Sequence, residues 1–391
     1  MRSTAPHRVP AGAAAATLLL AVGCGPSDAQ PDDPAPSPAA TTEAPADPDP
    51  ATSPDSTPST EPGAAAGDPV LTDVASGLAA PWDVAWLGDR AFVTERDSGR
   101  LLEIADDGTL TEVRTFAIEP AGEGGLLGLT AHPGGSWLYA YLTTRSDNRV
   151  VRFDPDTVND PEVIVDGIPA APTHDGGRLA FGPDGMLFIA TGDAQDPRAA
   201  QDESSLAGKI LRVTPDGDVP DDNPTEGSPV WSLGHRNVQG LAFDVDGRLF
   251  APEFGPDRDD EINRIEPGAN HGWPEVTGAA GATGFTDPIL VRQPPEASWS
   301  GGVVLTGGAI DRWEGDLFVA ALRGERLYRI PLEGGEVAGE PEELLVGELG
   351  RLRDVTQAPD GSLWLLTSNR DGRGSPSEAD DRIVRFGPPP G

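Results

Sequence analysis

The chain has 391 residues, enough for one large domain or two ordinary ones, and 64 acidic against 28 basic residues give it a formal net charge of −36. Such an acidic excess disfavours nucleic acid as a partner, because phosphate binding needs a basic surface. The chain has one cysteine, which excludes an internal disulfide bond, so the fold must be stable without one.

The N-terminus has the features of an export signal. Arg2 and Arg8 precede the apolar run AGAAAATLLLAVG, which is too short to span a bilayer but suits the apolar core of a signal peptide. Cys24 follows directly, and AVGC resembles a bacterial lipobox, which implies a diacylglycerol anchor on Cys24. We therefore expect a lipoprotein signal peptide over 1–23 and a mature protein that is exported and anchored to the outer face of the cell membrane.

Residues 24–68 predict a disordered tether. The segment is rich in Pro, Ala and Asp and contains no Lys or Arg. Such a composition cannot bury enough apolar surface to offset the entropy cost of ordering the chain. At about 3.1 Å per residue, an extended proline-rich tether reaches on the order of 100 Å from the membrane. We expect the folded domain to span 69–391.

The domain contains six copies of one pattern, in which an apolar pair, a short turn of Asp, Gly or Pro and a β-rich run follow one another. In chain order the copies are WDVAWLGDRAFVTE, LLGLTAHPGGSWLYAYL, GRLAFGPDGMLFIATGD, QGLAFDVDGRLFAPEFG, VVLTGGAIDRWEGDLFVAAL and RDVTQAPDGSLWLLTS. Most are followed by a second run that has an arginine among alternating apolar residues, such as NRVVRFDPD or DRIVRFGPP. Alternation of period two broken by Asp-Gly is typical of a β-hairpin.

Six hairpin copies without a long helical pattern predict an all-β fold, a six-bladed β-propeller with four strands per blade. A solenoid requires more regular spacing, and a sandwich would not repeat one motif six times; seven blades is the main alternative. In a propeller the inner strands converge on one axial channel, so residues far apart in the sequence can meet at one mouth. The fold by itself names no function.

Several polar clusters are not explained by strand formation. His174 lies at the start of the third copy, and Asp193 closes it nineteen residues later. GHRN contains Arg236, whose simplest structural role is to pair with a surface acid. FGPDRDDEIN places carboxylates beside a Gly-Pro bend, which is either an acidic turn or the oxygen-rich site that calcium prefers. RLRDV places Arg351 and Arg353 on one side of a strand, which suits a polyanionic ligand held by forked hydrogen bonds.

In this order, the clusters resemble the soluble pyrroloquinoline quinone (PQQ)-dependent sugar dehydrogenases, the glucose/sorbosone or aldose sugar dehydrogenase family. The resemblance covers nearly all of 78–386 and rests on GGLLGL, H-x-GGRLAFGPDG with the GD that follows, GK-I-LR, GHRN-x-QGLAF, GP-x-x-DDEIN, NHGWP and R-x-RDV. It implies a six-bladed propeller, in agreement with the repeat count. It also implies PQQ- and calcium-dependent oxidation of an aldose to the lactone. The lipoprotein signal is similar to that of actinobacterial members.

The resemblance implies catalytic roles for His174, Asp193 and Arg236, and a cofactor contact for Asn237. It makes His174 the general base and Asp193 its hydrogen-bonded orienting partner. Imidazole suits this task because its unperturbed pKa lies near the working pH, and a carboxylate fixes which ring nitrogen is free. Arg236 and Asn237 would lie against the quinone oxygens, where charge develops as hydride arrives.

The resemblance also implies two calcium sites. The backbone carbonyls of Gly255 and Pro256 would bind the catalytic ion, which acts as a Lewis acid on the quinone. Glu261, together with the backbone of His271, matches a second, structural calcium site of relatives.

Arg351 and Arg353 match the pair that binds the cofactor's carboxylates, but two cavity residues depart from the family pattern. Glu123 stands where relatives usually have glutamine. A carboxylate can only accept hydrogen bonds, and it would repel a cofactor with several carboxylates unless Arg236 or a proton compensates. Arg323 stands where sugar-oxidising relatives commonly have lysine, so the charge is kept and the shape is not.

The sequence is compatible with three functions. The first is an exported, lipid-tethered aldose dehydrogenase that passes electrons to an unidentified acceptor. The second is a non-catalytic propeller lipoprotein acting as a cell-envelope binding module, which Glu123 and the unusual tail favour. The third is a calcium-dependent lactonase, which is disfavoured because the paired arginines and GHRN have no role in lactone hydrolysis.

The other histidines and the tryptophans are interpreted mainly as structural residues. His132 is interpreted as a turn residue and His235 as bonding the backbone of its loop. For Trp299 both packing and substrate contact stay open. Packing between blades is expected for the other tryptophans, Trp82, Trp86, Trp137, Trp231, Trp273, Trp313 and Trp364.

Overall fold

The computed structural model describes residues 68–119, 122–157 and 159–389. The signal peptide, Cys24 and nearly all of the predicted tether lie outside the described residues. Within the described ranges no helix is long and apolar enough to cross a membrane.

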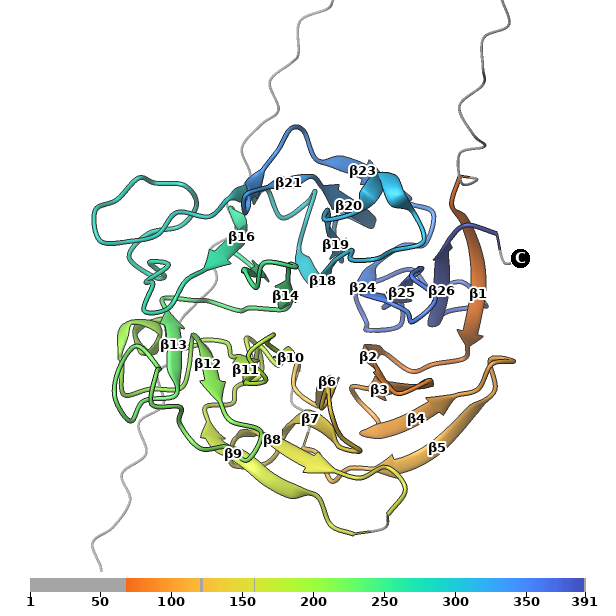
Figure 1. Cartoon of the computed structure of the whole chain (residues 1–391), viewed down its shortest axis with the longest axis horizontal. Helices are drawn as coiled ribbons and strands as arrows, with labels where there is room; N and C mark the ends of the chain where they lie inside the picture. The colour runs from red at the N-terminus through yellow and green to blue at the C-terminus, as the bar shows by residue number, and fades with distance from the viewer. Residues whose placement is uncertain (1–67, 120–121, 158, 390–391) are drawn as a thin grey trace, which may run out of the picture. The chain divides into compact units, whose positions relative to one another are not determined.

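Six four-stranded antiparallel sheets surround a central axis, as Figure 1 shows. From the inner to the outer strand, the first three are β2 (Pro81–Leu87), β3 (Arg90–Glu95), β4 (Arg100–Ile104) and β5 (Leu110–Thr115); β6 (Leu126–Ala131), β7 (Leu138–Thr143), β8 (Asn148–Phe153) and β9 (Glu162–Ile168); and β10 (Leu179–Phe181), β11 (Leu187–Ala190), β12 (Lys209–Val213) and β13 (Val230–Leu233). The next two are β14 (Ala242–Phe243), β15 (Leu249–Glu253), β16 (Asp260–Ile265) and β17 (Leu290–Arg292); and β18 (Trp299–Val304), β19 (Leu317–Ala321), β20 (Arg326–Ile330) and β23 (Glu342–Leu344). The sixth is β24 (Leu352–Gln357), β25 (Leu363–Thr367), β26 (Arg382–Gly387) and β1 (Val70–Ser76).

The connections add little regular structure. A two-stranded hairpin of β21 (Leu332–Glu333) and β22 (Glu336–Val337) follows β20. Two short 3-10 helices span Pro197–Gln201 and Asp311–Trp313.

The six sequence copies correspond to the six inner hairpins. WDVAWLGDRAFVTE forms β2 and β3, and RDVTQAPDGSLWLLTS forms most of β24 and β25. The arginine-containing runs supply the third strand of each blade, such as β8 and β26. The predicted six-bladed propeller is therefore confirmed, because each local copy builds one blade.

The ring is closed by pairing between the two ends of the described chain. β1 runs antiparallel to β26, with Val70 opposite Gly387, and becomes the outer strand of the last blade. No sequence copy indicated this pairing, because β1 precedes the first hairpin and its partner lies about three hundred residues away.

The apolar core lies between neighbouring blades. Phe318 and Leu327 of the fifth blade pack in one cluster with Leu352 of the sixth, and Trp86 meets Trp364 edge-on at 5.1 Å between ring centroids. Trp299 is completely buried, with its ring centroid 4.8 Å from that of Tyr328. Packing therefore accounts for Trp299, and the alternative of substrate contact is wrong.

Candidate functional site

His174 and Asp193 form a hydrogen-bonded pair at the third blade. His174 lies in the loop before β10, and Asp193 follows β11. The histidine Nδ1 is 2.7 Å from Oδ1 of the buried aspartate. Because a carboxylate can only accept, Nδ1 carries the proton and Nε2 remains able to accept one. The predicted contact is present, and the catalytic role stays a prediction.

Local glycines allow these two segments to approach one another. A Cβ at Gly192 would lie 1.9 Å from the carbonyl oxygen of His174, and a Cβ at Gly176 would lie 2.5 Å from the carbonyl carbon of Thr191. His174 itself has a φ of 66°, an uncommon backbone conformation for a residue with a side chain. The GG and GD of the third copy are therefore needed to bring the imidazole to the carboxylate.

Two further donors hold the aspartate. Oδ1 of Asp193 also accepts from the backbone N–H of Gln195 at 2.9 Å, and Oδ2 accepts from the indole N–H of Trp273 at 2.9 Å. Trp273 belongs to the long connection between β16 and β17. Its assignment to packing alone is wrong, since its polar edge contacts the predicted orienting residue.

Arg236 lies beside this pair. Its carbonyl oxygen accepts from the backbone N–H of Asp193 at 2.8 Å, and its guanidinium donates to the carbonyl oxygen of Phe254 at 3.2 Å. The guanidinium carbon lies 5.5 Å from the ring centroid of Trp273. Burial lowers the pKa of Arg236 from its ordinary value, because the charged form loses hydration. The simple structural role of pairing with a surface acid is not what the structure shows.

Asn237 presents an unsatisfied donor. Its side chain is buried, and Oδ1 accepts from the backbone N–H of Gly176 at 3.0 Å. Among the described residues, Nδ2 has no hydrogen-bond partner. A buried amide without a partner costs stability, so this atom suits an acceptor oxygen of a ligand.

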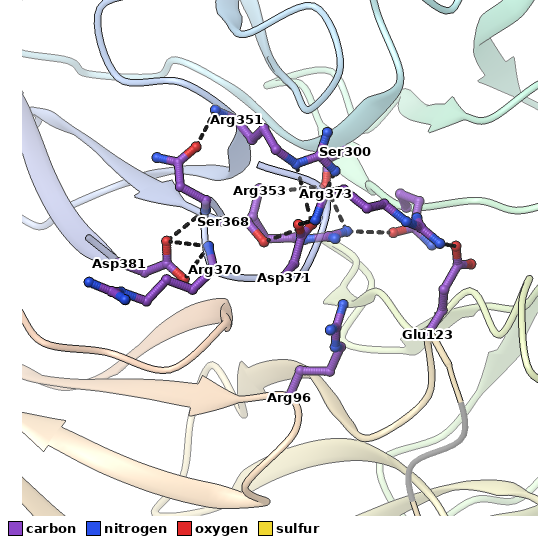
Figure 2. A network of polar contacts seen from close by, with 12 residues as sticks. Arg96, Glu123, Ser300, Arg351, Arg353, Ser368, Arg370, Asp371, Arg373 and Asp381 are labelled. Carbon is purple, nitrogen blue, oxygen red and sulfur yellow. Dashed lines mark hydrogen bonds and ion pairs between the residues drawn. The ribbon is translucent and has the colours of Figure 1, made fainter. Parts of the chain in front are cut away.

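Residues from all six blades line a cavity at the axis, which we call the arginine cavity. Figure 2 shows part of its polar network. The charged residues that line it are Arg96, Glu123, Asp175, Arg323, Arg351, Arg353 and Arg373. Four of them, Glu123, Arg323, Arg351 and Arg353, were predicted to bind the cofactor. The imidazole of His174 is not part of the lining, although the next residue, Asp175, and Glu123, which accepts from the backbone N–H of His174, are.

Sequence reasoning missed Arg96 and Arg373. Arg96 directly follows β3, and Arg373 lies in the polar stretch after β25, in SNRDGRG. Asp193 occupies a similar place after β11. A charged residue that follows the second strand of an inner hairpin was therefore the available signal for residues at this mouth.

Arg353 is a buried cation that lacks an ion-pair partner among the described residues. Its NH1 donates to the side-chain oxygen of Gln239 at 3.0 Å. Burial and the neighbouring charge of Arg96 lower the pKa of Arg353 to about 9. Arg351, by contrast, pairs with Asp371 at 3.0 Å. The cavity therefore has positive charge that an anionic ligand would neutralise.

Glu123 is compensated inside the protein. One oxygen pairs with the guanidinium of Arg373 at 2.9 Å, and the other accepts from the backbone N–H of His174 at 3.2 Å. Although burial alone would raise the pKa of Glu123, these two donors hold it below the ordinary value. The expectation that Arg236 or a proton would compensate this charge is corrected, because Arg373 does so.

The four predicted metal-binding residues line one small pocket. Gly255, Pro256, Glu261 and His271 meet there, and Glu253 joins them. Burial, followed by the charge of Glu253, raises the pKa of Glu261 to about 8, and burial raises that of Glu253 to about 7. Two buried carboxylates that repel each other are what a calcium ion would stabilise, so the donor set fits the metal.

The acids of the neighbouring bend have other roles. Asp260 accepts from the backbone N–H groups of Gly255 at 2.8 Å and Ser298 at 2.6 Å, so it supports the bend. In the part of the chain that the structure describes, no group of three or more His, Cys, Asp or Glu side chains is arranged to hold a metal. Calcium binding here would therefore depend on backbone carbonyls as well as carboxylates.

Two histidines lie outside the base position. Nδ1 of His235 is 2.9 Å from Glu253, and Nε2 is 2.8 Å from the hydroxyl of Ser232, so the predicted bond to loop backbone is wrong. His132 accepts from the backbone N–H of Gly134 at 3.1 Å, as expected of a turn residue.

Fold and site together define a class, a six-bladed propeller with a histidine–carboxylate pair beside an arginine-lined axial cavity. The family model described as Glucose / Sorbosone dehydrogenase matches residues 78–377. The chain therefore belongs to the glucose/sorbosone dehydrogenase family, and the resemblance seen in its motifs is confirmed.

Individual relatives agree with this assignment. The solved PQQ-bound aldose sugar dehydrogenase from Streptomyces coelicolor has 44% sequence identity and a TM-score of 0.77, with 83% of this chain and 99% of that one covered. The aldose sugar dehydrogenase YliI of Escherichia coli is 32% identical over 64% of this chain and 76% of its own length. The quinoprotein glucose dehydrogenase B of Acinetobacter calcoaceticus is 30% identical over 54% of each chain.

Proposed function

We propose that this protein oxidises an aldose at the anomeric carbon to the lactone, with PQQ and calcium as cofactors. The observation that carries the proposal is the His174–Asp193 pair, next to Asp175, which lines an axial cavity with five arginines in its lining. The names of the relatives support the same chemistry.

The cofactor would occupy the arginine cavity. Its carboxylates would suit Arg351, Arg353 and Arg323 of the lining. Its quinone oxygens would suit the unpartnered amide of Asn237 and Arg236, which lines the neighbouring pocket that shares Phe254 with the cavity. The carbonyls of Gly255 and Pro256 would hold the catalytic calcium beside it, with Glu261 and the backbone of His271 at the second ion. When bound, the quinone supplies a hydride acceptor and the calcium a Lewis acid.

In the proposed reaction, Nε2 of His174 removes the proton of the anomeric hydroxyl. The carbon–oxygen double bond forms as the anomeric hydrogen leaves with its electron pair, so one proton stays on the imidazole and one hydride leaves the sugar. Asp193 keeps the ring in the tautomer that can accept this proton and stabilises the imidazolium. The fixed charge of Arg236 favours negative charge that develops beside it.

The two alternatives lose support. Glu123 motivated a non-catalytic binding module, but its charge is paired with Arg373, which offsets part of its repulsion toward an anionic ligand. A lactonase gives no role to the cations of the cavity.

The decisive experiment is turnover by the purified protein. Loaded with calcium and PQQ, it should reduce an artificial dye when aldoses are added. The matched control is the same protein assayed for lactone hydrolysis without quinone. Failure to bind quinone by calorimetry would overturn the proposal.

We further propose that the protein is exported and anchored through Cys24 to the outer face of the cell membrane, and passes electrons to an acceptor that remains to be identified. The lipobox-like AVGC supports the anchor. Incorporation of labelled fatty acid into the wild type and not into Cys24→Ser would test it.

Replacing Glu123 by Gln is expected to tighten PQQ binding about tenfold. The substitution removes a negative charge from a cavity that receives a polyanion, and it releases Arg373 from its ion pair. Calorimetric titration of the calcium-loaded protein measures the change. Unchanged or weaker binding would show that Glu123 is not repulsive.

Calcium is expected to raise the Tm of the quinone-free protein more at pH 8 than at pH 5. The pKa values of Glu253 (about 7) and Glu261 (about 8) lie above the ordinary 4.5, so the folded state binds more protons than the unfolded state. Stability without metal therefore falls as the pH rises from about 5 to 8, and calcium replaces the lost protons. Thermal melts with EDTA or calcium measure this, with Glu261→Gln as the variant that loses the effect. An equal calcium effect at both pH values would contradict it.

A further inference from the structure

We propose that Trp273 is a positioning residue of the reaction, whose indole N–H orients the carboxylate of Asp193 and whose ring supports the guanidinium of Arg236. This inference rests on the proposed function. It deepens it by adding a residue that holds one group of the proposed chemistry and one that orients the base, and that lines the pocket of the predicted metal-binding residues together with Arg236.

The indole N–H of Trp273 completes the hydrogen bonding of the Asp193 carboxylate. Oδ1 of the aspartate takes two contacts, from the ring of His174 at 2.7 Å and the N–H of Gln195 at 2.9 Å. Oδ2 has the indole N–H, at 2.9 Å. The aspartate side chain is fully buried, so water cannot replace a lost donor there. Without the indole, the carboxylate could turn and change the direction in which the imidazole points.

The face of the same ring lies against Arg236. The guanidinium carbon is 5.5 Å from the ring centroid, within the range of a cation–π contact. Within the described residues no ion pair holds Arg236, and its only side-chain hydrogen bond goes to the carbonyl oxygen of Phe254. The ring of Trp273 therefore restricts the Arg236 guanidinium, which would otherwise be held only by its hydrogen bond to Phe254.

Trp273 is itself fixed without any ligand. Its backbone N–H donates to the carbonyl oxygen of Gly234 at 2.9 Å, and its carbonyl oxygen accepts from the amide of Gln201 at 2.7 Å. These contacts tie the β16–β17 connection to the loops on either side of β12 and β13. One rigid side chain thus sets the relative position of the proposed base pair and of Arg236.

The charges around this group are known from the structure. Asp193 faces Arg236 and Glu253, and His174 faces Asp175, with Glu123 bonded to its backbone N–H. Trp273→Phe leaves each of these charges in place and keeps an aromatic face. It therefore removes the indole donor and the volume of one ring but keeps an aromatic face, whereas Trp273→Leu removes donor and face together.

For Trp273→Phe we expect kcat to fall about tenfold, because part of the general-base contribution is lost. The affinity for PQQ should stay within twofold of the wild type. Without the indole donor, Asp193 stabilises the protonated imidazole more strongly. The acidic limb of the kcat/KM profile should therefore move to higher pH. For Trp273→Leu we expect the same loss of kcat and, in addition, PQQ binding several-fold weaker in calorimetry of the quinone-free protein.

The matched control is Trp137→Phe. Trp137 is exposed and also lies under an arginine, Arg152 at 5.2 Å, but it is not part of the cavity lining. It should keep the kcat, pH profile and quinone affinity of the wild type. The Tm of every variant is measured together with its kinetics.

A Trp273→Phe protein with the kcat and pH profile of the wild type would overturn the inference. So would a loss of kcat that comes with a lower Tm and an unmoved pH profile, since that result indicates a structural role. If the wild type itself neither binds quinone nor oxidises aldoses, the proposed function fails. A wild type that turns over beside an unaffected Trp273→Phe refutes only the role of Trp273.

Discussion

Replacing His174 by Asn is expected to lower kcat for aldose oxidation by about a thousandfold, while PQQ affinity stays within a few-fold of the wild type. The imidazole is the only group bonded to Asp193 that could take a proton from a hydroxyl, and general-base catalysis contributes about 10² to 10⁴ in rate. Asn is the appropriate substitute because it tolerates the backbone φ of 66° at this position. Steady-state dye reduction and calorimetric titration of the same preparation measure the two quantities.

His132→Gln is the control for this experiment. His132 bonds a turn N–H and lies outside the site, so its replacement should leave kcat unchanged. A His174→Asn protein with nearly normal kcat would mean that another group removes the proton. Equal losses of kcat and of quinone affinity would instead indicate that His174 shapes the cofactor site.

Replacing Arg353 by Met is expected to weaken PQQ binding by at least about a hundredfold. The guanidinium is buried in the arginine cavity and forms no ion pair within the described residues, so a bound carboxylate would meet a cation that is largely shielded from solvent. The same substitution should leave the Tm of the quinone-free protein unchanged or raise it. Burial, followed by the charge of Arg96, lowers the pKa of Arg353 to about 9, which is the direction expected of a buried cation that destabilises the quinone-free protein.

Arg385→Met provides the comparison for this substitution. Arg385 lies on β26 and pairs with Asp360 at 3.0 Å on the outside of the blade, so its loss should not alter quinone binding. Calorimetry and thermal melts distinguish the two effects of Arg353→Met. Quinone binding of wild-type strength would remove Arg353 from the cofactor site, and a large fall in Tm would show that the guanidinium stabilises the fold.

Much of the fold could be predicted because each blade begins as a local pattern. The inner hairpins combine short apolar runs, such as the one around Leu187, with alternation such as that of Val355 between polar neighbours, and Asp-Gly turns separate the strands. Local periodicity of this kind is a property of the chain before it folds. The site residues recognised from motifs also lie in short segments, as His174 and Asp193 do on two sides of one hairpin.

What the sequence could not supply are contacts between segments that are far apart. Trp273 reaches Asp193 across 80 residues, and its NHGWP motif gave no sign of that bond, so the ring was assigned to packing. Arg373 meets Glu123 only because the loops of the sixth and second blades both reach the axial cavity.

The sequence by itself therefore determined six hairpin blades, the family and most of the charged residues of the site, since these depend on short-range order. Only the tertiary structure decided how β1 closes the ring against β26, which cation neutralises Glu123, and that Trp273 connects Asp193 with Arg236. The reason is physical: local alternation selects strands and turns, whereas the partners of a buried polar group depend on how distant loops pack around the axis.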